Sequence, residues 1–465
     1  MLTPPTRSRL LTAAFATALL AMPATSNADA PAGGAAYVPG EVVVRYEPDA
    51  GGAARTAVQQ KTGVGEPRAI AAHSRVLKIR DGETVAETVR ELRDRPEVAA
   101  AAPNPIARIS AYVPIDPGNS SVAGGWQALQ WNFLAGAGVD APDAWQHLID
   151  AGRPGGRGVV VAVLDTGVAY SSSGRCLRGV RCRRSPDLGA GDFTPGYDFV
   201  AGDRRPQDEN GHGTHVASTI GEKTGNTFGL TGLAYGARIM PVRVLDRFGE
   251  GDSFAIAAGI RYAARRGADI INLSFEFDGG VSRSQIPNIL EALRFARRRG
   301  VLVVGASGNA SARKVAYPAR ADDVLSVGAT TEHGCQADYS NKGADLDLTA
   351  PGGGADADLR DDANCRPDEP SGRNIFQVTF RAERAVGRFG IPSDYKGTSM
   401  AAPHVSATAA LVIASGILGS RPPVAALQEH LKATARDLGP PGPDSRYGYG
   451  MVDADRATDP AFRSS

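Results

Sequence analysis

This sequence has few cysteines, almost no net charge and few long apolar segments, and each of these features argues against certain classes of protein or partner. The chain has only four cysteines among its 465 residues, an even number. Its net charge of +1 argues against nucleic acid as the main partner, because phosphate backbones are attracted by a basic surface. Beyond the N-terminus, no apolar run approaches the roughly 20 residues that a membrane-spanning helix needs. A chain of this length can still bury a large core and form more than one domain.

The N-terminus has the pattern of a secretory signal peptide over residues 1–28. Arg7 and Arg9 precede an apolar stretch at residues 10–22, and small residues at 26–28 offer a cleavage site. A membrane anchor is the alternative, but this apolar stretch is shorter than a span requires. The sequence therefore predicts an exported, soluble protein, either released into the medium or kept in a periplasm.

Residues 29–118 alternate short strand and helix patterns and contain no catalytic motif. Strands are predicted at residues 41–46, 74–79, 98–101 and 106–110, and helices at residues 53–62 and 85–92. This order of elements indicates a small ferredoxin-like α/β sandwich.

One serine stands where a loop turns into a helix. The segment Gly-Thr-Ser-Met-Ala-Ala-Pro-His occupies residues 397–404, and Gly397 permits a tight turn before small residues suited to a closely packed helix. Pro403 is expected in the opening turn, where a missing N–H does no harm. Ser399 would then lie at the positive end of the helix dipole and act as a nucleophile if a base stands beside it. A helix N-cap is the alternative role.

Two further segments supply an aspartate and a histidine. Residues 159–167 form an apolar run that ends in Asp165 and Gly167, a pattern typical of a buried parallel strand with its carboxylate at the C-terminal end. Ligands gather at that edge of open α/β sheets. His212, in the segment Asn-Gly-His-Gly-Thr-His, lies at another glycine-to-helix junction. Groups that can orient a base, act as a base and attack a carbonyl thus follow in the order Asp165, His212, Ser399.

These segments together resemble the subtilisin-like serine proteases, whose signatures are Asp-Thr-Gly, His-Gly-Thr-His and Gly-Thr-Ser-Met-Ala. The resemblance implies a catalytic domain over residues 119–465, with a three-layer α/β fold around a mostly parallel central sheet. It also implies that Asp165, His212 and Ser399 form a catalytic triad, and that Asn309 and the Ser399 amide bind the oxyanion. No cofactor is required for this chemistry, and the expected substrates are polypeptides.

The resemblance also suggests a role for the first domain. Residues 29–118 stand between a signal peptide and a protease, as does the inhibitory propeptide of subtilisin-like zymogens. An unrelated adaptor or binding domain is the alternative. The implied protein is a secreted, monomeric serine endopeptidase that is made as a self-processing zymogen. The cut is expected within residues 111–122, a loop rich in Pro, Gly and Ser.

Two other classes of protein fit the motifs less well. A lipase or esterase of the α/β-hydrolase type needs a Gly-x-Ser-x-Gly elbow, whereas Ser399 lies in Gly-Thr-Ser-Met-Ala. A binding-only relative of the proteases would lack a triad or oxyanion residue, and all four are present.

In the family, two segments line the primary substrate pocket. Here they consist of Ser274, Phe275 and Glu276, and of Ala306, Ser307 and Gly308. Glu276 replaces a glycine that normally lets the substrate backbone come close. One hypothesis is that its carboxylate faces the pocket and favours arginine or lysine before the scissile bond. We prefer the alternative, in which the carboxylate points to solvent after a small local shift.

Acidic residues, including Asp208 and Glu209, crowd the loop before His212. Asp198, Asp203 and Gln207 match positions that bind calcium in some family members, so a structural calcium ion is one interpretation. The preferred interpretation is a solvated loop whose carboxylates are neutralised by its two adjacent arginines, Arg204 and Arg205.

The four cysteines allow two pairs. Cys176 and Cys182 are close in sequence, so in an exported chain they predict a small surface disulfide. A metal site at this place would lack histidine ligands nearby. Cys335 and Cys365 remain, and a second disulfide between them would fix a loop-rich, acidic insertion at residues 352–396.

Overall fold

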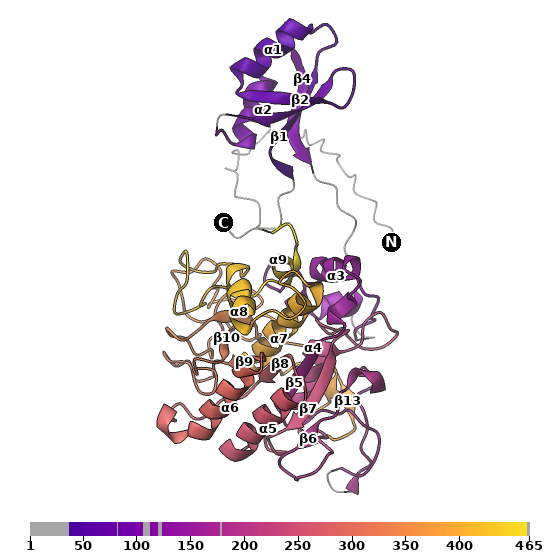
Figure 1. Cartoon of the computed structure of the whole chain (residues 1–465), viewed down its shortest axis with the longest axis vertical. Helices are drawn as coiled ribbons and strands as arrows, with labels where there is room; N and C mark the ends of the chain where they lie inside the picture. Colours follow the sequence, from indigo (N-terminus) through magenta and orange to yellow (C-terminus); the bar gives the residue numbers. More distant parts are fainter. Residues whose placement is uncertain (1–36, 81, 106–111, 120–122, 177–178, 463–465) are drawn as a thin grey trace, which may run out of the picture. The chain divides into compact units, whose positions relative to one another are not determined.

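The structure is a computed structural model that describes residues 37–80, 82–105, 112–119, 123–176 and 179–462 (Figure 1). The predicted signal peptide at residues 1–28 and the predicted strand at residues 106–110 therefore lie outside the described residues. The chain divides into two compact units, Met1–Ile109 and Ser110–Ser465, each with a hydrophobic core of its own.

The first unit is a four-stranded antiparallel sheet with two helices. Its elements in chain order are β1 (Tyr37–Tyr46), α1 (Gly52–Lys61), β2 (Val64–Ala69), β3 (Ser74–Ile79), α2 (Val85–Arg93) and β4 (Val98–Pro105). The strands lie in the order β2-β3-β1-β4, and Val44, Leu77 and Leu92 are fully buried between sheet and helices. The predicted ferredoxin-like sandwich is confirmed. β2 was not predicted, because its glycine and proline interrupt the pattern of a strand.

A seven-stranded sheet forms the centre of the second unit. Its strands are β5 (Val160–Asp165), β6 (Tyr197–Asp198), β7 (Arg238–Arg243), β8 (Ile270–Leu273), β9 (Leu302–Ala306), β10 (Leu325–Thr330) and β11 (Leu348–Pro351). They lie in the order β11-β10-β9-β8-β5-β7-β6, and all neighbours pair in parallel. From β5 the chain continues to β6 and β7, which lie on one side of β5 in the sheet. It then crosses to β8, which lies on the other side of β5. The C-terminal ends of β5 and β8 therefore form a switch point, where α/β sheets bind ligands.

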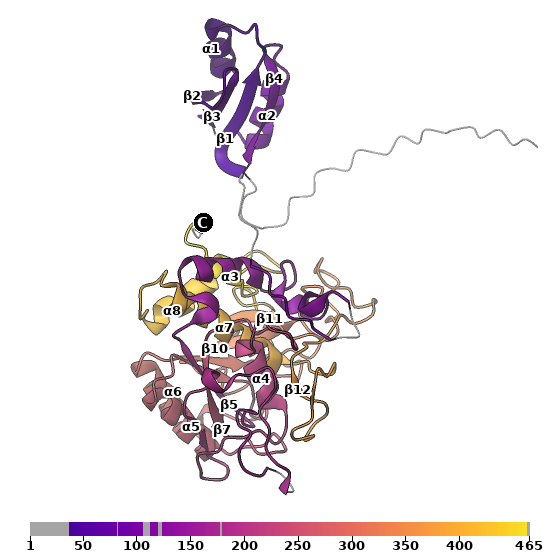
Figure 2. The same cartoon turned by 90° about the vertical axis from the view of Figure 1, so that its right-hand side faces the viewer.

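Helices cover both faces of this sheet. They are α3 (Ala141–Asp150), α4 (His212–Gly221), α5 (Ser253–Arg265), α6 (Pro287–Arg298), α7 (Thr398–Ser415), α8 (Val424–Ala433) and α9 (Ala454–Thr458). Val161 and Val163 of β5 share a core with α4 and α7, whereas Ala162 and Leu164 share the other core with α5 and α6. Alternate residues of β5 thus face two helix layers, which confirms the predicted three-layer α/β fold. Figure 2 shows α5 and α6 on one side of β5 and α4 on the other. Within the described part of the chain, no helix combines the length and apolarity needed to cross a membrane.

The segment before the second unit's first helix packs on that unit, so the boundary lies earlier than the predicted position after residue 118. Asp116 is buried, and its carboxylate accepts hydrogen bonds from the N–H groups of Gly225 and Asn226 at 2.8 and 3.1 Å. The indole N–H of Trp126 donates to the Pro114 carbonyl at 2.9 Å. These contacts place residues 112–119 with the larger unit.

Both predicted disulfides are present. Cys176 is bonded to Cys182 within one loop. Cys335 is bonded to Cys365, which lies in the predicted insertion at residues 352–396. The same insertion carries a small antiparallel pair, β12 (Thr379–Phe380) and β13 (Phe389–Gly390).

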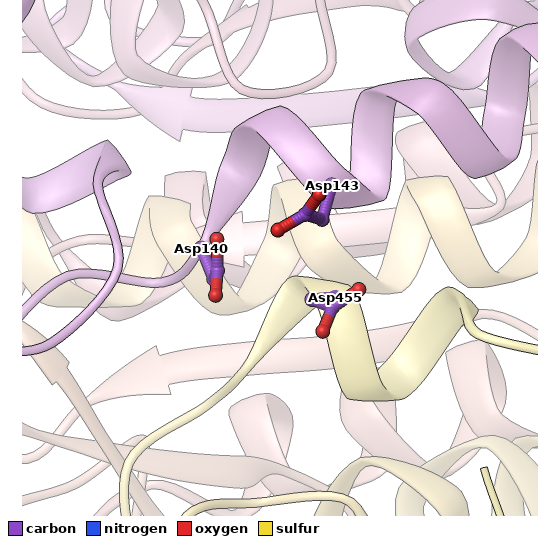
Figure 3. Close-up of side chains that lie close together, drawn as sticks. All are labelled: Asp140, Asp143 and Asp455. Carbon is purple, nitrogen blue, oxygen red and sulfur yellow. The ribbon is translucent and has the colours of Figure 1, made fainter. Parts of the chain in front are cut away.

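Three carboxylates gather where the start of α3 meets α9 (Figure 3). Asp140 and Asp143 come from the start of α3 and Asp455 from α9, and one oxygen of each lies within 4.8 Å of the others. Burial, followed by the charges of neighbouring carboxylates, raises the pKa of Asp455 to about 7 and that of Asp140 to about 6. The folded chain therefore binds protons here more tightly than the unfolded chain does.

Asp455→Asn is expected to stabilise the protein at pH 8 and to leave its stability nearly unchanged at pH 4. A carboxyl group whose pKa is raised from 3.8 to about 7 by folding favours the folded state at low pH, and this contribution is lost as the pH rises through about 7. Removing the charge should therefore add about 1 kcal/mol to the free energy of unfolding at pH 8. Thermal unfolding in EDTA at both pH values tests this, with exposed Asp150→Asn as the control. A lower melting temperature for Asp455→Asn than for the wild type at pH 8 contradicts it.

Candidate active site

The end of β5 and the start of α4 bring Asp165 and His212 together. His212 Nδ1 lies 2.8 Å from Asp165 Oδ1, and the carboxylate is fully buried while 26% of the imidazole side chain remains exposed. The N–H of Thr166 donates to the same Oδ1 at 2.7 Å. Burial lowers the pKa of His212, but the charge and hydrogen bond of Asp165 outweigh that effect, so the pKa is raised above its usual value. This geometry leaves Nε2 as the ring nitrogen that can accept a proton.

A second buried carboxylate, Asp208, joins the two turns that carry this pair. Its Oδ1 accepts hydrogen bonds from Thr166 Oγ1 at 2.9 Å and from the N–H groups of Asn210 and Gly211 at 2.8 and 3.0 Å. Its Oδ2 accepts from the N–H and the hydroxyl of Thr214 at 3.0 and 2.6 Å. Because Thr166 follows β5 and Thr214 lies in α4, the Asp208 side chain fixes β5 relative to α4.

Ser399 stands at the second position of α7, where its N–H has no intrahelical acceptor. Pro403 lies inside this helix, beyond the opening turn in which it was predicted, so the Ser399 carbonyl loses its usual partner four residues on. The hydroxyl of Ser274, which follows β8, donates to that carbonyl at 2.8 Å. Ser274 thereby ties the end of β8 to the turn that carries Ser399.

Asn309 follows β9, and its side-chain amide is oriented by the start of α7. Its Oδ1 accepts hydrogen bonds from the N–H and the hydroxyl of Thr398 at 2.8 and 3.0 Å. Because Oδ1 is engaged in this way, Nδ2 is the atom of the amide that can donate to a ligand beside Ser399.

The side chains that can act on a ligand line one cavity of about 350 Å³. Its lining includes His212, Asn309 and Ser399, together with four of the predicted pocket residues, Ser274, Phe275, Glu276 and Ala306. The structure does not place Ser307 and Gly308 in this lining. The Ser307 side chain is buried and donates to the Asn341 carbonyl at 3.1 Å, and the Gly308 N–H donates to Thr398 Oγ1 at 3.2 Å.

Ser399 Oγ and His212 share this cavity without a hydrogen bond between them in the described part of the chain. Catalytic contacts of this kind are often long without substrate and tighten in the complex. The buried Asp165 carboxylate and the Ser399 backbone are both fixed by hydrogen bonds, so the His212–Ser399 contact is the one left to adjust.

The Glu276 side chain is exposed, and its carboxylate is bonded to a neighbouring backbone group. Its Oε1 accepts a hydrogen bond from the Asn309 N–H at 2.9 Å. The carboxylate lies over Gly308, where an added Cβ would stand only 2.2 Å from Oε2. With a φ of +108°, Gly308 meets both a conformational and a steric requirement for glycine. The Asn309 N–H therefore determines where the exposed carboxylate lies.

Comparison with known proteins identifies the family. The model of the Subtilase family matches residues 156–450. The chain is a subtilase. Subtilisin Savinase from Lederbergia lenta is 36% identical over 332 residues, which cover 71% of this chain and 99% of that protein. The Thermophilic serine proteinase of Bacillus sp. (strain AK1) is 31% identical over 384 residues, which cover 82% of this chain and 79% of that protein.

A solved structure and a second family model extend this result. The structure of a protease from Pseudoalteromonas arctica PAMC 21717 matches with a TM-score of 0.58 at 28% identity, covering 75% of this chain and 99% of that chain. The model of the Fervidolysin N-terminal prodomain matches residues 23–104. This subtilase is therefore a serine proteinase, a hydrolase, with a prodomain ahead of its protease domain.

Two other histidines of the subtilase motifs are buried and bonded to backbone carbonyls. His215 Nε2 lies 3.0 Å from the Ile375 carbonyl, and burial lowers the pKa of His215 to about 3. His404 Nδ1 lies 2.8 Å from the Met400 carbonyl, and burial lowers the pKa of His404 to about 4. Both are neutral at physiological pH and neither lines the cavity, so His212 is the histidine placed to act as a base.

Calcium binding is common among subtilases, but the residues predicted for it here are engaged elsewhere. Asp198 accepts two backbone N–H groups of its own loop and pairs with Arg243 at 3.0 Å. Arg243 also pairs with Glu209 at 3.2 Å, so it takes the neutralising role predicted for the two arginines of the loop. Asp203 and Gln207 bond to neighbouring backbone groups. A guanidinium beside the carboxylates does not fit a cation site, and we assign no calcium to these residues.

Asp208→Ala is expected to destabilise the protein by about 3 kcal/mol or more, because it leaves five buried donors without their acceptor. Denaturant unfolding in a Ser399→Ala background, which prevents self-digestion, measures this loss. Asp203→Asn is the control, since Asp203 is exposed, and its effect should stay within about 0.5 kcal/mol. Equal stability of the two variants would show that Asp208 does not hold the junction.

Proposed function

We propose that this subtilase is an exported serine endopeptidase that hydrolyses peptide bonds of proteins through Asp165, His212 and Ser399. One observation carries the proposal: the 2.8 Å contact between Asp165 Oδ1 and His212 Nδ1 at a cavity that Ser399 also lines. A buried carboxylate, an imidazole with a free Nε2 and a serine at a helix N-terminus are the groups that acyl transfer requires.

In the first half-reaction, Ser399 Oγ attacks the scissile carbonyl carbon while His212 Nε2 takes its proton. Asp165 accepts the Nδ1–H hydrogen bond, which fixes the tautomer and stabilises the imidazolium. The negative charge that forms on the carbonyl oxygen is bound by Asn309 Nδ2 and by the Ser399 N–H. The tetrahedral intermediate then expels the amine, which leaves with the proton from His212, and an acyl-enzyme remains.

In the second half-reaction, water replaces the amine. His212 removes a proton from the water as its oxygen attacks the ester, the same two donors bind the oxyanion, and Ser399 recovers its proton when the acid leaves. Every proton in both half-reactions passes through His212, so the cycle requires no cofactor.

We further propose that the first unit is a propeptide that inhibits the protease until the protease cuts it off. The prodomain match over residues 23–104 supports this role over that of an adaptor. The cut should fall before Asp116, because that residue is buried in the larger unit. The predicted signal peptide at residues 1–28 supports export, and the mature enzyme is proposed to act as a monomer free of membrane and nucleic acid.

Asn309→Leu should lower kcat by about 100- to 1,000-fold with a small change in KM, because the lost donor acts mainly on the transition state. Initial rates on a peptide substrate, together with the melting temperature, separate this effect from unfolding. A similar loss confined to KM would place Asn309 in substrate binding and not in oxyanion stabilisation.

The wild type should lose its first unit, whereas Ser399→Ala should keep it. Intact mass and N-terminal sequencing of the two exported proteins give the result, and the new N-terminus of the wild type is expected between the end of β4 and Asp116. Identical processing of both proteins would exclude self-processing. A cut after Asp116 would contradict the placement of the processing site.

A further inference from the structure

The cavity that contains the catalytic groups has one carboxylate in its described lining, that of Glu276. The other lining side chains are neutral apart from the imidazole of His212. The charge that contributes to the raised pKa of Glu276 is that of Asp278, which is also negative. Among the ion pairs of the described residues none includes Glu276, so this carboxylate has no cationic partner in that part of the chain.

The position of this carboxylate is fixed by the same elements that hold the reacting groups. Its Oε1 accepts from the N–H of Asn309, whose side chain is proposed to bind the oxyanion. Ser274, two residues before Glu276, bonds to the Ser399 carbonyl. The carboxylate is therefore held between the ends of β8 and β9, beside Asn309, which is proposed to bind the oxyanion of the scissile carbonyl.

One oxygen of the carboxylate remains for a ligand. Oε1 accepts from the Asn309 N–H, whereas Oε2 lies over Gly308 and accepts no hydrogen bond given for the described residues. Burial raises the pKa of Glu276, opposed in part by hydrogen bonds from the backbone and the side chain of Asn309. An ammonium or guanidinium group that enters such a site gains a charge-assisted hydrogen bond. An apolar side chain would instead bury the carboxylate without a partner, which is unfavourable.

We propose that Glu276 makes this subtilase select a cationic side chain, arginine or lysine, on the residue that contributes the scissile carbonyl. The inference rests on the proposed function, because it concerns the substrate of the same active site. In this role Glu276 affects the cleavage of substrates with a charged side chain more than that of substrates with an uncharged one.

A peptide series tests the charge selection directly. The peptides differ only in the residue before the scissile bond, which is arginine, lysine, citrulline, alanine or phenylalanine. Citrulline has nearly the shape of arginine but carries no charge. We expect kcat/KM to be at least about tenfold higher for arginine than for citrulline, the ratio that one charge-assisted hydrogen bond supports. A ratio near 1, or faster cleavage of the phenylalanine or alanine peptide than of the arginine peptide, overturns the proposal.

Two matched variants locate the effect. Glu276→Gln keeps an oxygen for the Asn309 N–H but loses the charge, so its arginine-to-citrulline ratio should fall to about 1. Asp278→Asn removes an equally negative neighbour that does not line the cavity, and its ratio should stay within about threefold of the wild-type ratio. Retention of the wild-type ratio by Glu276→Gln overturns the proposal.

Labelling of Ser399 with a fluorophosphonate separates this inference from the proposed function. A wild-type enzyme that takes the label but does not discriminate arginine from citrulline retains its proposed function and refutes the role of Glu276. A wild-type enzyme that neither takes the label nor cleaves any peptide refutes both.

Discussion

The active site depends on one buried carboxylate that does no chemistry. Asp208 accepts five hydrogen bonds from the turn after β5 and from the start of α4, and these two segments carry Asp165 and His212. Such an anion is costly to bury, and its cost is offset only when every donor is in place. The network therefore has one low-energy arrangement, and that arrangement puts His212 Nδ1 against Asp165 Oδ1.

A second junction joins the other half of the site by the same means. Pro403 removes a donor from α7, and the Ser274 hydroxyl at the end of β8 replaces it at the Ser399 carbonyl. Thr398 in turn orients the Asn309 amide after β9. The C-terminal ends of β5, β8 and β9 are thus each hydrogen-bonded to a helix start. Because the parallel sheet aligns these ends, segments far apart in the sequence meet at a single cavity.

Much of this arrangement could be predicted from the sequence, because its signals are local. Buried apolar strands that end in Asp165 or Asn309, and glycine turns before His212 and Ser399, each indicate a position at the sheet edge. The predictions failed where a side chain has a choice of partners. The loop arginines were expected to neutralise Asp198, but Arg243 does so from a distant segment. The bond between the Glu276 carboxylate and the Asn309 N–H was likewise not predicted. The importance of Asp208 was hidden for the same reason, since its donors come from both sides of the junction.

The most direct test of the account is the rate at which a fluorophosphonate modifies the protein as a function of pH, with the modified residue identified by mass spectrometry. One adduct is expected, on Ser399, formed at a rate that rises as His212 loses its proton. The apparent pKa of that rise should exceed the usual histidine value of 6.5, because Asp165 stabilises the imidazolium. An adduct on another residue, or a rate independent of pH between about 5 and 9, would contradict the assignment of His212 as the base.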